Sequence, residues 1–222
     1  MEEMFYNCTS LKEIDFSDFK TNEVTNMNYM FSGWSSLTEL NISKFDTSNV
    51  ISMKGLFKNC TSITKINVSN LNNKNVTDMS EMFDRCLNLK NLGIYNFKTD
   101  KVTNMGSMFS NCEKLNSIDL SKFKTDNVTN MNYMFHYCRT LNSINVSKFN
   151  TNNVTNMYGM FLGTNLRVLN LSNFNVDNVT DMEKMFGINN IKEEELIRSQ
   201  IKNIKDEAFF RPNDDSSSSE SD

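Results

Sequence analysis

Apolar and polar residues alternate along this chain in a pattern that repeats every 26 residues. The valine that opens the pattern recurs at intervals of 26 residues, with one final interval of 25, at Val24, Val50, Val76, Val102, Val128, Val154 and Val179. A fixed period of this length is typical of proteins in which each repeat is one small structural unit stacked on the next. The pattern therefore predicts a repeat solenoid over residues 1–190, with about seven units, the first of them partial.

The first half of each unit has the apolar spacing of a short helix. Apolar residues occupy positions i, i+3, i+6 and i+7, as in Val128, Met131, Met134 and Phe135. This spacing places them on one face of about two helical turns. Thr129 or Asn130 is in position to cap the helix by accepting a hydrogen bond from a free amide. We therefore predict a short helix in the first half of every unit.

The second half of each unit has the alternation of a strand. Leu141, Ile144 and Val146 are spaced so that the last two share one face, while Asn145 and Ser147 point the other way. Neither half can bury its apolar face alone, and stacking copies of the unit solves this. The predicted fold class is α/β, with a parallel sheet on one side of the solenoid and short helices on the other.

Sulfur-containing residues also lie in columns. Every methionine except Met1 falls into two of them, which could supply soft-metal ligands or fill a core beside phenylalanine. Repetition through the whole array favours the core, and no metal site is predicted. The five cysteines are odd in number and lack CxxC spacing, and Trp34 stands in their column. We expect free thiols in a buried apolar slot.

The polar positions of the predicted strands form the candidate binding face. Their mid-strand column is nearly all Asn or Asp, and Gly93 with Tyr95 interrupts it in the fourth strand. This face is either a solvated sheet surface or a polar docking surface, which is how repeat solenoids commonly use their sheet side. The candidate residues are Asp15, Asn41, Asn67, Gly93, Tyr95, Asp119, Asn145 and Asn170.

Charge and composition narrow the possible functions. Residues 1–190 contain 18 basic and 18 acidic side chains, and residues 191–222 supply the whole net charge of −4. Without a basic stripe, nucleic-acid binding is not expected. The sequence shows no signal peptide and no apolar run long enough to insert into a membrane, so the chain is expected to be soluble. No nucleophile, base and oxyanion donor occur together, so catalysis is not predicted.

The two ends differ from the repeats. Apolar residues among charges from Ile191 to Phe210 predict an amphipathic cap helix over residues 191–210. Residues 211–222 are rich in serine and acidic residues and are expected to be disordered. At the other end the array starts within a unit at Met4, which leaves open the hypothesis of a truncated repeat-protein fragment.

The unit Met-Phe-x-x-Cys-x-x-Leu-x-x-Ile-x-Val, preceded by Val-Thr-Asn-Met, resembles that of the BspA-like leucine-rich-repeat surface proteins of the mycoplasma-lipoprotein type. The resemblance extends from Met4 to Phe186, and Phe149 stands where leucine-rich repeats usually have asparagine. It implies a curved leucine-rich-repeat-like solenoid that binds proteins or other macromolecules of a cell surface or matrix, often in adhesion, without catalysis and without a cofactor. A cell or virion surface is the location it implies.

The absence of a signal peptide and the expected free thiols support a different hypothesis, an intracellular scaffold or effector with the same fold.

Overall fold

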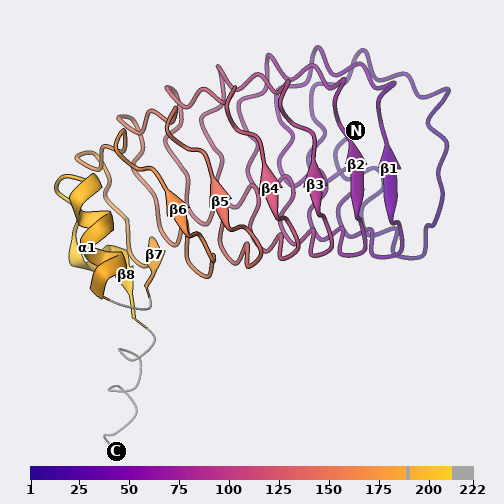
Figure 1. Ribbon diagram of the computed structural model, residues 1–222. Helices are drawn as coiled ribbons and strands as arrows, with labels where there is room; N and C mark the ends of the chain where they lie inside the picture. Colours follow the sequence, from indigo (N-terminus) through magenta and orange to yellow (C-terminus); the bar gives the residue numbers. More distant parts are fainter. Residues whose placement is uncertain (189–190, 212–222) are drawn as a thin grey trace, which may run out of the picture.

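The chain folds as a stack of similar rungs, one for each 26-residue unit (Figure 1). The computed structural model describes residues 1–188 and 191–211. Short strands follow one another along one side of the stack, and the helix α1 lies at its C-terminal end. The elements in chain order are β1 (Glu39–Asn41), β2 (Lys65–Asn67), β3 (Asn91–Leu92), β4 (Ser117–Ile118), β5 (Ser143–Ile144), β6 (Val168–Leu169), β7 (Phe186–Gly187), α1 (Ile191–Gln200), the 3-10 helix η1 (Asp206–Ala208) and β8 (Phe209–Phe210).

The strands of successive rungs pair in parallel, as the sequence pattern predicts. β1 pairs with β2, β3 with β4, and β5 with β6. Glu39 lies opposite Lys65, so the register between neighbouring strands equals one repeat of the sequence. Ser143 lies opposite Val168, because the unit between them is one residue shorter. The architecture is consistent with a repeat solenoid, although its strands form short pairs rather than one sheet of seven strands.

Five of the strands, β1, β2, β4, β5 and β6, are short because an asparagine or aspartate at the end of the strand turns the chain. Asn41 Oδ1 accepts a hydrogen bond from the amide of Ser43 at 3.0 Å, and Asn145 Oδ1 accepts one from the amide of Ser147 at 3.1 Å. A side-chain oxygen that binds the amide two residues further on closes a turn. The strand therefore ends after two or three residues, and the chain bends toward the far side of the rung.

The first half of each unit is not helical, and the prediction of short helices there is wrong. These segments consist of consecutive turns. Their alternate amides donate to carbonyls of the following rung, as the amide of Tyr29 does to Lys54 at 2.8 Å. Isolated parallel bridges run through this half of the stack, pairing Asn26 with Ser52, Ser52 with Asp78, and so on to Asp181. A second parallel ladder thus occupies the side where helices were expected.

Positive φ angles at two positions of each unit make this second ladder possible. Tyr29 has a φ of 53°, Gly55 in the next rung has 57°, and Asn59 at the second position has 58°. An α-helix needs negative φ throughout. Here residues with positive φ are interspersed with residues of negative φ, and every second amide points toward the neighbouring rung. An isolated helix of two turns is marginal in water. Because the neighbouring rung satisfies these amides, stacking favours the ladder.

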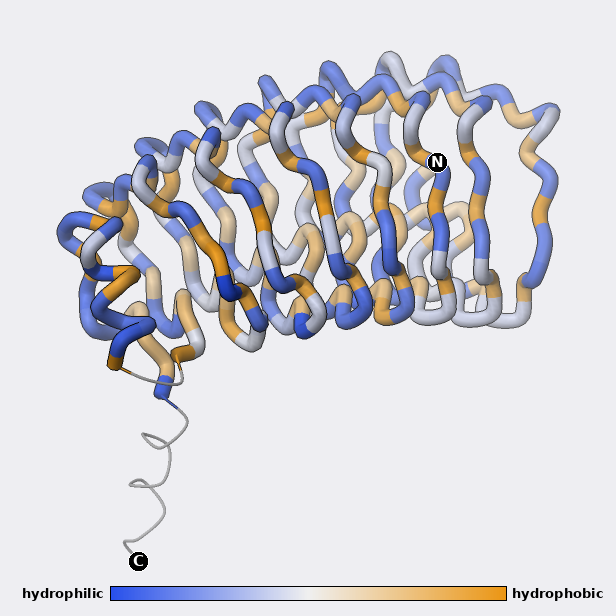
Figure 2. The backbone as a smooth tube through the Cα atoms, viewed as in Figure 1, coloured by the Kyte–Doolittle hydropathy of each residue, from blue (hydrophilic) through white to orange (hydrophobic). Residues whose placement is uncertain are grey.

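The predicted apolar columns form the core of the stack. All methionines from Met27 to Met185 are at most 1% exposed, which supports their interpretation as core residues. The tube in Figure 2 alternates between hydrophobic and hydrophilic segments along the strands, as expected when every second side chain points inward. Phenylalanine rings stack from rung to rung at centroid distances between 5.5 and 6.0 Å, through Phe31, Phe57, Phe83, Phe109, Phe135, Phe161, Phe186 and Phe209.

The cysteine column lies inside this core, and all five thiols are free. Cys60 Sγ donates to the carbonyl of Phe31 at 3.1 Å, and the three cysteines that follow it do the same one rung further on each time. Trp34 replaces cysteine in one rung, and its Nε1 donates to the equivalent carbonyl of Phe5 at 2.6 Å. Burial raises the pKa of Cys138 to about 12. Burial also raises the pKa of Cys86 and Cys112, so these three thiols are poor nucleophiles at neutral pH.

A strand, rather than one long helix, covers the last rung. The helix α1 ends at Gln200 and not at residue 210 as predicted, and it contains no fully buried residue. After η1, β8 pairs with β7, and Phe209 stacks on Phe186 at 6.0 Å. The cap therefore continues the phenylalanine column. Of the predicted disordered tail, residues 212–222 lie outside the described residues.

Candidate binding surfaces

The exposed side of β1–β6, which we call the strand face, carries the predicted binding residues. A shallow depression of about 1590 Å³ extends across it from residues 12–15 to residues 117–119. Five of the predicted residues line this depression: Asp15, Asn41, Asn67, Gly93 and Asp119. Three others do not line it: Tyr95, Asn145 and Asn170.

The predicted Asn/Asp column has a structural task that the sequence analysis missed. Hydrogen bonds from the hydroxyl and the amide of Ser17 lower the pKa of Asp15, and Ser121 does the same to Asp119. The corresponding asparagines accept equivalent hydrogen bonds, as described for Asn41. These side chains close the turn after each strand, so their oxygens already have partners within the rung. That the column also contacts a binding partner remains a prediction.

In one rung, Gly93 stands where the other rungs have the Asn or Asp of this turn, and Tyr95 stands where they have the Ser two residues later. Glycine offers no side-chain oxygen, and the amide of Ile94 instead donates to the carbonyl of Leu92 at 3.2 Å. A Cβ at Gly93 would lie 3.9 Å from Tyr95 Cε1, so the ring lies beside the glycine. With 52% of its surface exposed, Tyr95 is an accessible aromatic ring beside the depression.

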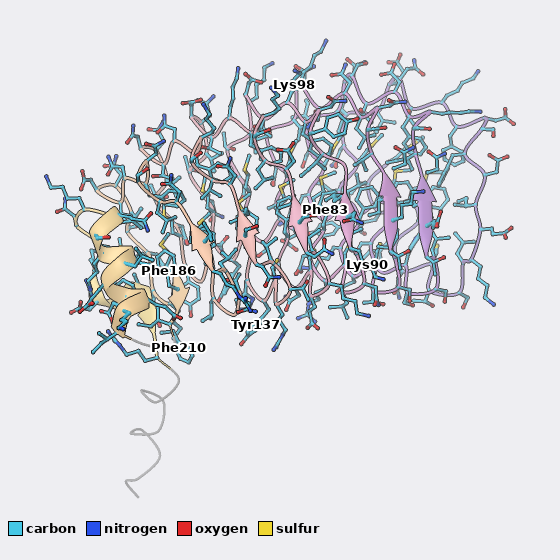
Figure 3. All side chains as sticks on the ribbon, in the orientation of Figure 1. Phe83, Lys90, Lys98, Tyr137, Phe186 and Phe210 are labelled. Atoms are coloured by element: carbon cyan, nitrogen blue, oxygen red, sulfur yellow. The ribbon has the colours of Figure 1, made fainter. Side chains whose placement is uncertain are left out.

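Charged side chains on the strand face are not engaged with one another. Glu39 and Lys65 lie opposite each other on β1 and β2, but no ion pair joins them. Within the described ranges, Lys12 and Lys90 form no ion pair either. Lys90 is labelled in Figure 3. The face therefore presents charges of both signs that a partner could contact.

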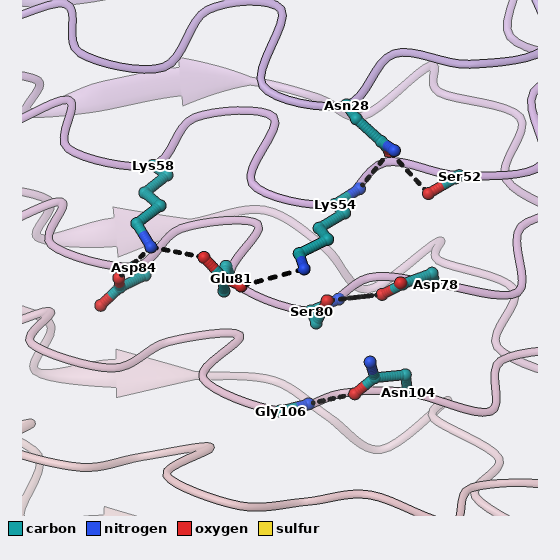
Figure 4. A network of polar contacts seen from close by, with 10 residues as sticks. All are labelled: Asn28, Ser52, Lys54, Lys58, Asp78, Ser80, Glu81, Asp84, Asn104 and Gly106. Atoms are coloured by element: carbon teal, nitrogen blue, oxygen red, sulfur yellow. Dashed lines mark hydrogen bonds and ion pairs between the residues drawn. The ribbon is translucent and has the colours of Figure 1, made fainter. Parts of the chain in front are cut away.

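The opposite side of the stack, which we call the turn face, pairs its charges instead (Figure 4). Lys58 contacts both Glu81 and Asp84, the latter at 3.5 Å, and Lys54 lies 3.4 Å from Glu81. Burial raises the pKa of Asp84 despite the nearby lysine. Burial also acts to raise the pKa of Glu81, but its hydrogen bond and charge interaction with Lys58 outweigh this and lower it. These side chains form a charged network between two neighbouring rungs.

A hollow of about 430 Å³ lies beside this charged network. Neither the hollow nor a role for His136 was predicted from the sequence. The His136 ring is half-buried between Tyr133 and Tyr137, at centroid distances of 4.8 and 4.2 Å. Figure 3 labels Tyr137 and Phe210, two of its aromatic residues. The hollow is lined by Asp84, Arg85, Ser107, Ser110, Asn111, Tyr133, His136, Tyr137, Tyr158, Leu162, Lys184 and Phe210.

One sequence signal could have pointed to this aromatic group. Tyr133 is followed by Gly159, and Tyr137 by Gly163, each one repeat later. In the structure both tyrosine rings lie over these glycines, where a Cβ would approach ring atoms to 2.8 and 1.9 Å. A tyrosine followed by glycine at the repeat distance therefore marks a ring that lies across the next rung.

The parallel strands and the buried columns define a repeat protein. The chain belongs to the family described as "Mycoplasma protein of unknown function, DUF285", whose family model matches residues 1–93 and 88–200 in tandem. No curated protein and no solved structure matches the chain. In the part of the chain that the structure describes, no helix is long and apolar enough to cross a membrane. The same residues contain no group of three His, Cys, Asp or Glu side chains placed to hold a metal ion.

Proposed function

We propose that this protein is a non-enzymatic binding module, a BspA-like leucine-rich-repeat solenoid whose strand face binds a protein or another macromolecule of a cell surface or matrix. The alternating inward residues of the strand half support the leucine-rich-repeat assignment. The thiols of Cys86, Cys112 and Cys138, whose pKa values burial raises, support a role without covalent catalysis. Adhesion at a surface is the form of binding that we favour.

The observation that carries this proposal is the depression across the strand face together with its unpaired charges. The depression spans five successive rungs, which is a larger surface than a small-molecule site needs. Glu39, Lys65 and Lys90 line it without ion-pair partners in the described ranges. Tyr95 adds an exposed ring next to them. Tyrosine is enriched at the centre of protein interfaces, so a macromolecular partner fits this surface best.

Binding of the full chain to cultured epithelial cells and to a solubilised matrix extract tests the proposal. A double variant, Lys65→Glu with Lys90→Glu, reverses two charges inside the depression. The control, Lys101→Glu with Lys148→Glu, makes the same charge change at exposed lysines outside it. We expect the first variant to weaken binding at least about tenfold, a loss of about 1.4 kcal/mol, and the control to bind as the natural chain does.

Equal losses in both variants would show that net charge rather than this face drives binding, and absence of binding to either material would contradict the proposal. Fractionation of the source cells adds a separate test of location. A surface-exposed protein agrees with adhesion, whereas a protein confined to the cytosol would replace it with the intracellular scaffold.

A further inference from the structure

We propose that the hollow on the turn face is a carbohydrate site that takes a neutral pyranose ring, such as the terminal sugar of a glycan. Its volume of about 430 Å³ lies within the range of about 300–1,000 Å³ that small-ligand sites occupy. The site is separate from the strand face and does not depend on the function proposed for it. Four features of the hollow lead to a sugar.

The floor of the hollow comes from one rung with unusually small side chains. Ser107 and Ser110 line it. The rung before this one has Glu81 and Asp84 at the same two positions, and the rung after it has Tyr133 and His136. A recess therefore opens between a charged wall and an aromatic wall. A flat ring with polar edges can enter such a recess and meet both walls.

The aromatic wall is held in place before any ligand arrives. Tyr133 packs edge-on against Tyr158 at 5.0 Å as well as against His136. Gly159 leaves the space over which the ring of Tyr133 lies. A tyrosine ring offers an apolar face together with a hydroxyl. This combination suits a sugar, whose ring carries C–H bonds on its faces and hydroxyls on its edges.

The polar wall offers acceptors and donors side by side. Asp84 is only 7% exposed and lines the hollow with its buried carboxylate. Asn111 Nδ2 lies 3.5 Å from Asp84 Oδ1 and donates to Ser110 Oγ at 2.9 Å. Arg85 adds further donors at the rim. A sugar hydroxyl is both donor and acceptor, so it can bind a carboxylate and an amide at the same time.

The charge around the hollow favours a neutral ligand over a phosphate-bearing one. Phosphate recognition relies on clustered arginine or lysine donors. Arg85 and Lys184 line the hollow, but so does Asp84, and the negative charges of Asp181 and Glu183 act on the nearby Tyr133 hydroxyl. The mixture of signs gives no net attraction for an anion. A nucleotide therefore fits this site less well than a glycoside.

Saturation-transfer NMR on the full chain tests this inference with methyl glycosides of glucose, galactose, mannose and N-acetylglucosamine, and with adenosine monophosphate as the charged comparison. We expect signal for at least one glycoside and its loss in Tyr133→Ala, which should weaken binding about tenfold. Tyr29→Ala is the matched control, because Tyr29 has the same repeat position, a similar φ and its own glycine, Gly55, in the next rung. It should bind as the natural chain does.

A second variant, Asp84→Asn, keeps the shape of the hollow and removes the carboxylate, so it should also weaken glycoside binding. The charge reversal Lys148→Glu, at an exposed lysine outside both the hollow and the strand-face depression, should leave it unchanged. Three results would overturn the inference: no signal from any glycoside, binding of adenosine monophosphate alone, or equal losses in Tyr133→Ala and Tyr29→Ala.

Discussion

The ring of Tyr137 lies across Gly163 of the following rung so closely that a Cβ at Gly163 would sit 1.9 Å from the ring's Cδ1 atom. Tyr29 with Gly55 and Tyr133 with Gly159 repeat this relationship. In each pair the glycine also has a positive φ, between 57° and 72°. Other rungs have residues such as Glu81 and Asn111 at these positions with a positive φ, so it is the space under the ring that requires glycine, and its positive φ adds strain to any replacement.

Replacing Gly163 by alanine should destabilise the fold by about 2 kcal/mol, because alanine is strained at positive φ and its Cβ would displace the tyrosine ring. Chemical denaturation measures this difference. Gly93→Ala is the matched control, since Gly93 has no positive φ and its Cβ would meet no atom closer than 3.9 Å. Equal stability of the two variants would contradict the close approach of Tyr137 to Gly163.

A second substitution separates space from backbone strain. Tyr137→Ala removes the ring, so the combined variant Tyr137→Ala with Gly163→Ala should lose less stability than the two single effects added together. The strain of alanine at positive φ remains in the combined variant, so recovery should be partial. Full additivity in this double-mutant cycle would mean that the ring and the glycine do not interact.

Replacing Asn73 by threonine should stabilise the protein by about 1 kcal/mol. Threonine stands at this buried position in several rungs. There its hydroxyl donates a hydrogen bond to the carbonyl of a residue in the next rung and accepts one from the amide of the same residue. Thr99 does so with Lys124, at 2.8 and 2.7 Å. Asn73 accepts a hydrogen bond from the amide of Lys98 at 3.0 Å, but its buried Nδ2 has no partner. Threonine would keep the first bond and remove the unpaired group.

The reverse substitution, Thr99→Asn, is the matched control for this prediction. It should introduce the same unpaired amide and lower the unfolding free energy by about 1–3 kcal/mol. Denaturation midpoints of the two variants should therefore move in opposite directions. A loss of stability in Asn73→Thr would show that Asn73 has a role other than pairing with Lys98.

His136 should make stability depend on pH near neutrality. Burial lowers its pKa below the ordinary value of 6.5, so the folded state binds fewer protons than the unfolded state in this range. Stability is therefore fully present above the unfolded pKa of 6.5 and falls as the pH drops through 6.5 toward the folded pKa. The chain has one histidine, so a single NMR titration curve reports its pKa directly. His136→Gln should remove this pH dependence, and a measured pKa at or above 6.5 would contradict the burial of the ring.

Phe109→Ala should cost about 3–5 kcal/mol, because the ring is fully buried and stacks between Phe83 and Phe135 at 5.8 and 5.6 Å. Lys101→Ala, at an exposed position of the same array, should change stability by less than about 0.5 kcal/mol. Thermal and chemical denaturation compare the two. Similar small effects would mean that the phenylalanine column is not the core.

Much of the architecture follows from the sequence, because the 26-residue period and the buried columns have a single simple arrangement, rung on rung. The helix prediction failed because Val128, Met131, Met134 and Phe135 fit one helical face and also fit the inward side of a turn ladder. Nothing in the identity of Tyr29 or Glu81 indicates a positive φ. That conformation depends on hydrogen bonds to the next rung, and the pattern of apolar residues within one unit does not reveal those bonds.

The candidate surfaces were harder to predict for the same reason. Asn41 and Asp119 suggested a docking column, yet their side chains first serve the turns after the strands. The hollow on the turn face joins residues more than a hundred positions apart, from Asp84 to Phe210, and only the stacking brings them together. In the sequence the hollow is marked by two tyrosine–glycine pairs one repeat apart, Tyr133 with Gly159 and Tyr137 with Gly163.

In the turn half of each unit, alternate amides donate to the next rung, and the amides between them close turns within the unit, so no helix forms. Couplings across hydrogen bonds, measured by NMR on a chain labelled with ¹⁵N and ¹³C, test this arrangement directly. The structure predicts a coupling between the amide nitrogen of Tyr29 and the carbonyl carbon of Lys54, whose oxygen lies 2.8 Å from that nitrogen. A coupling from Tyr29 to Thr25, four residues earlier in the same unit, would establish a helix and contradict the account.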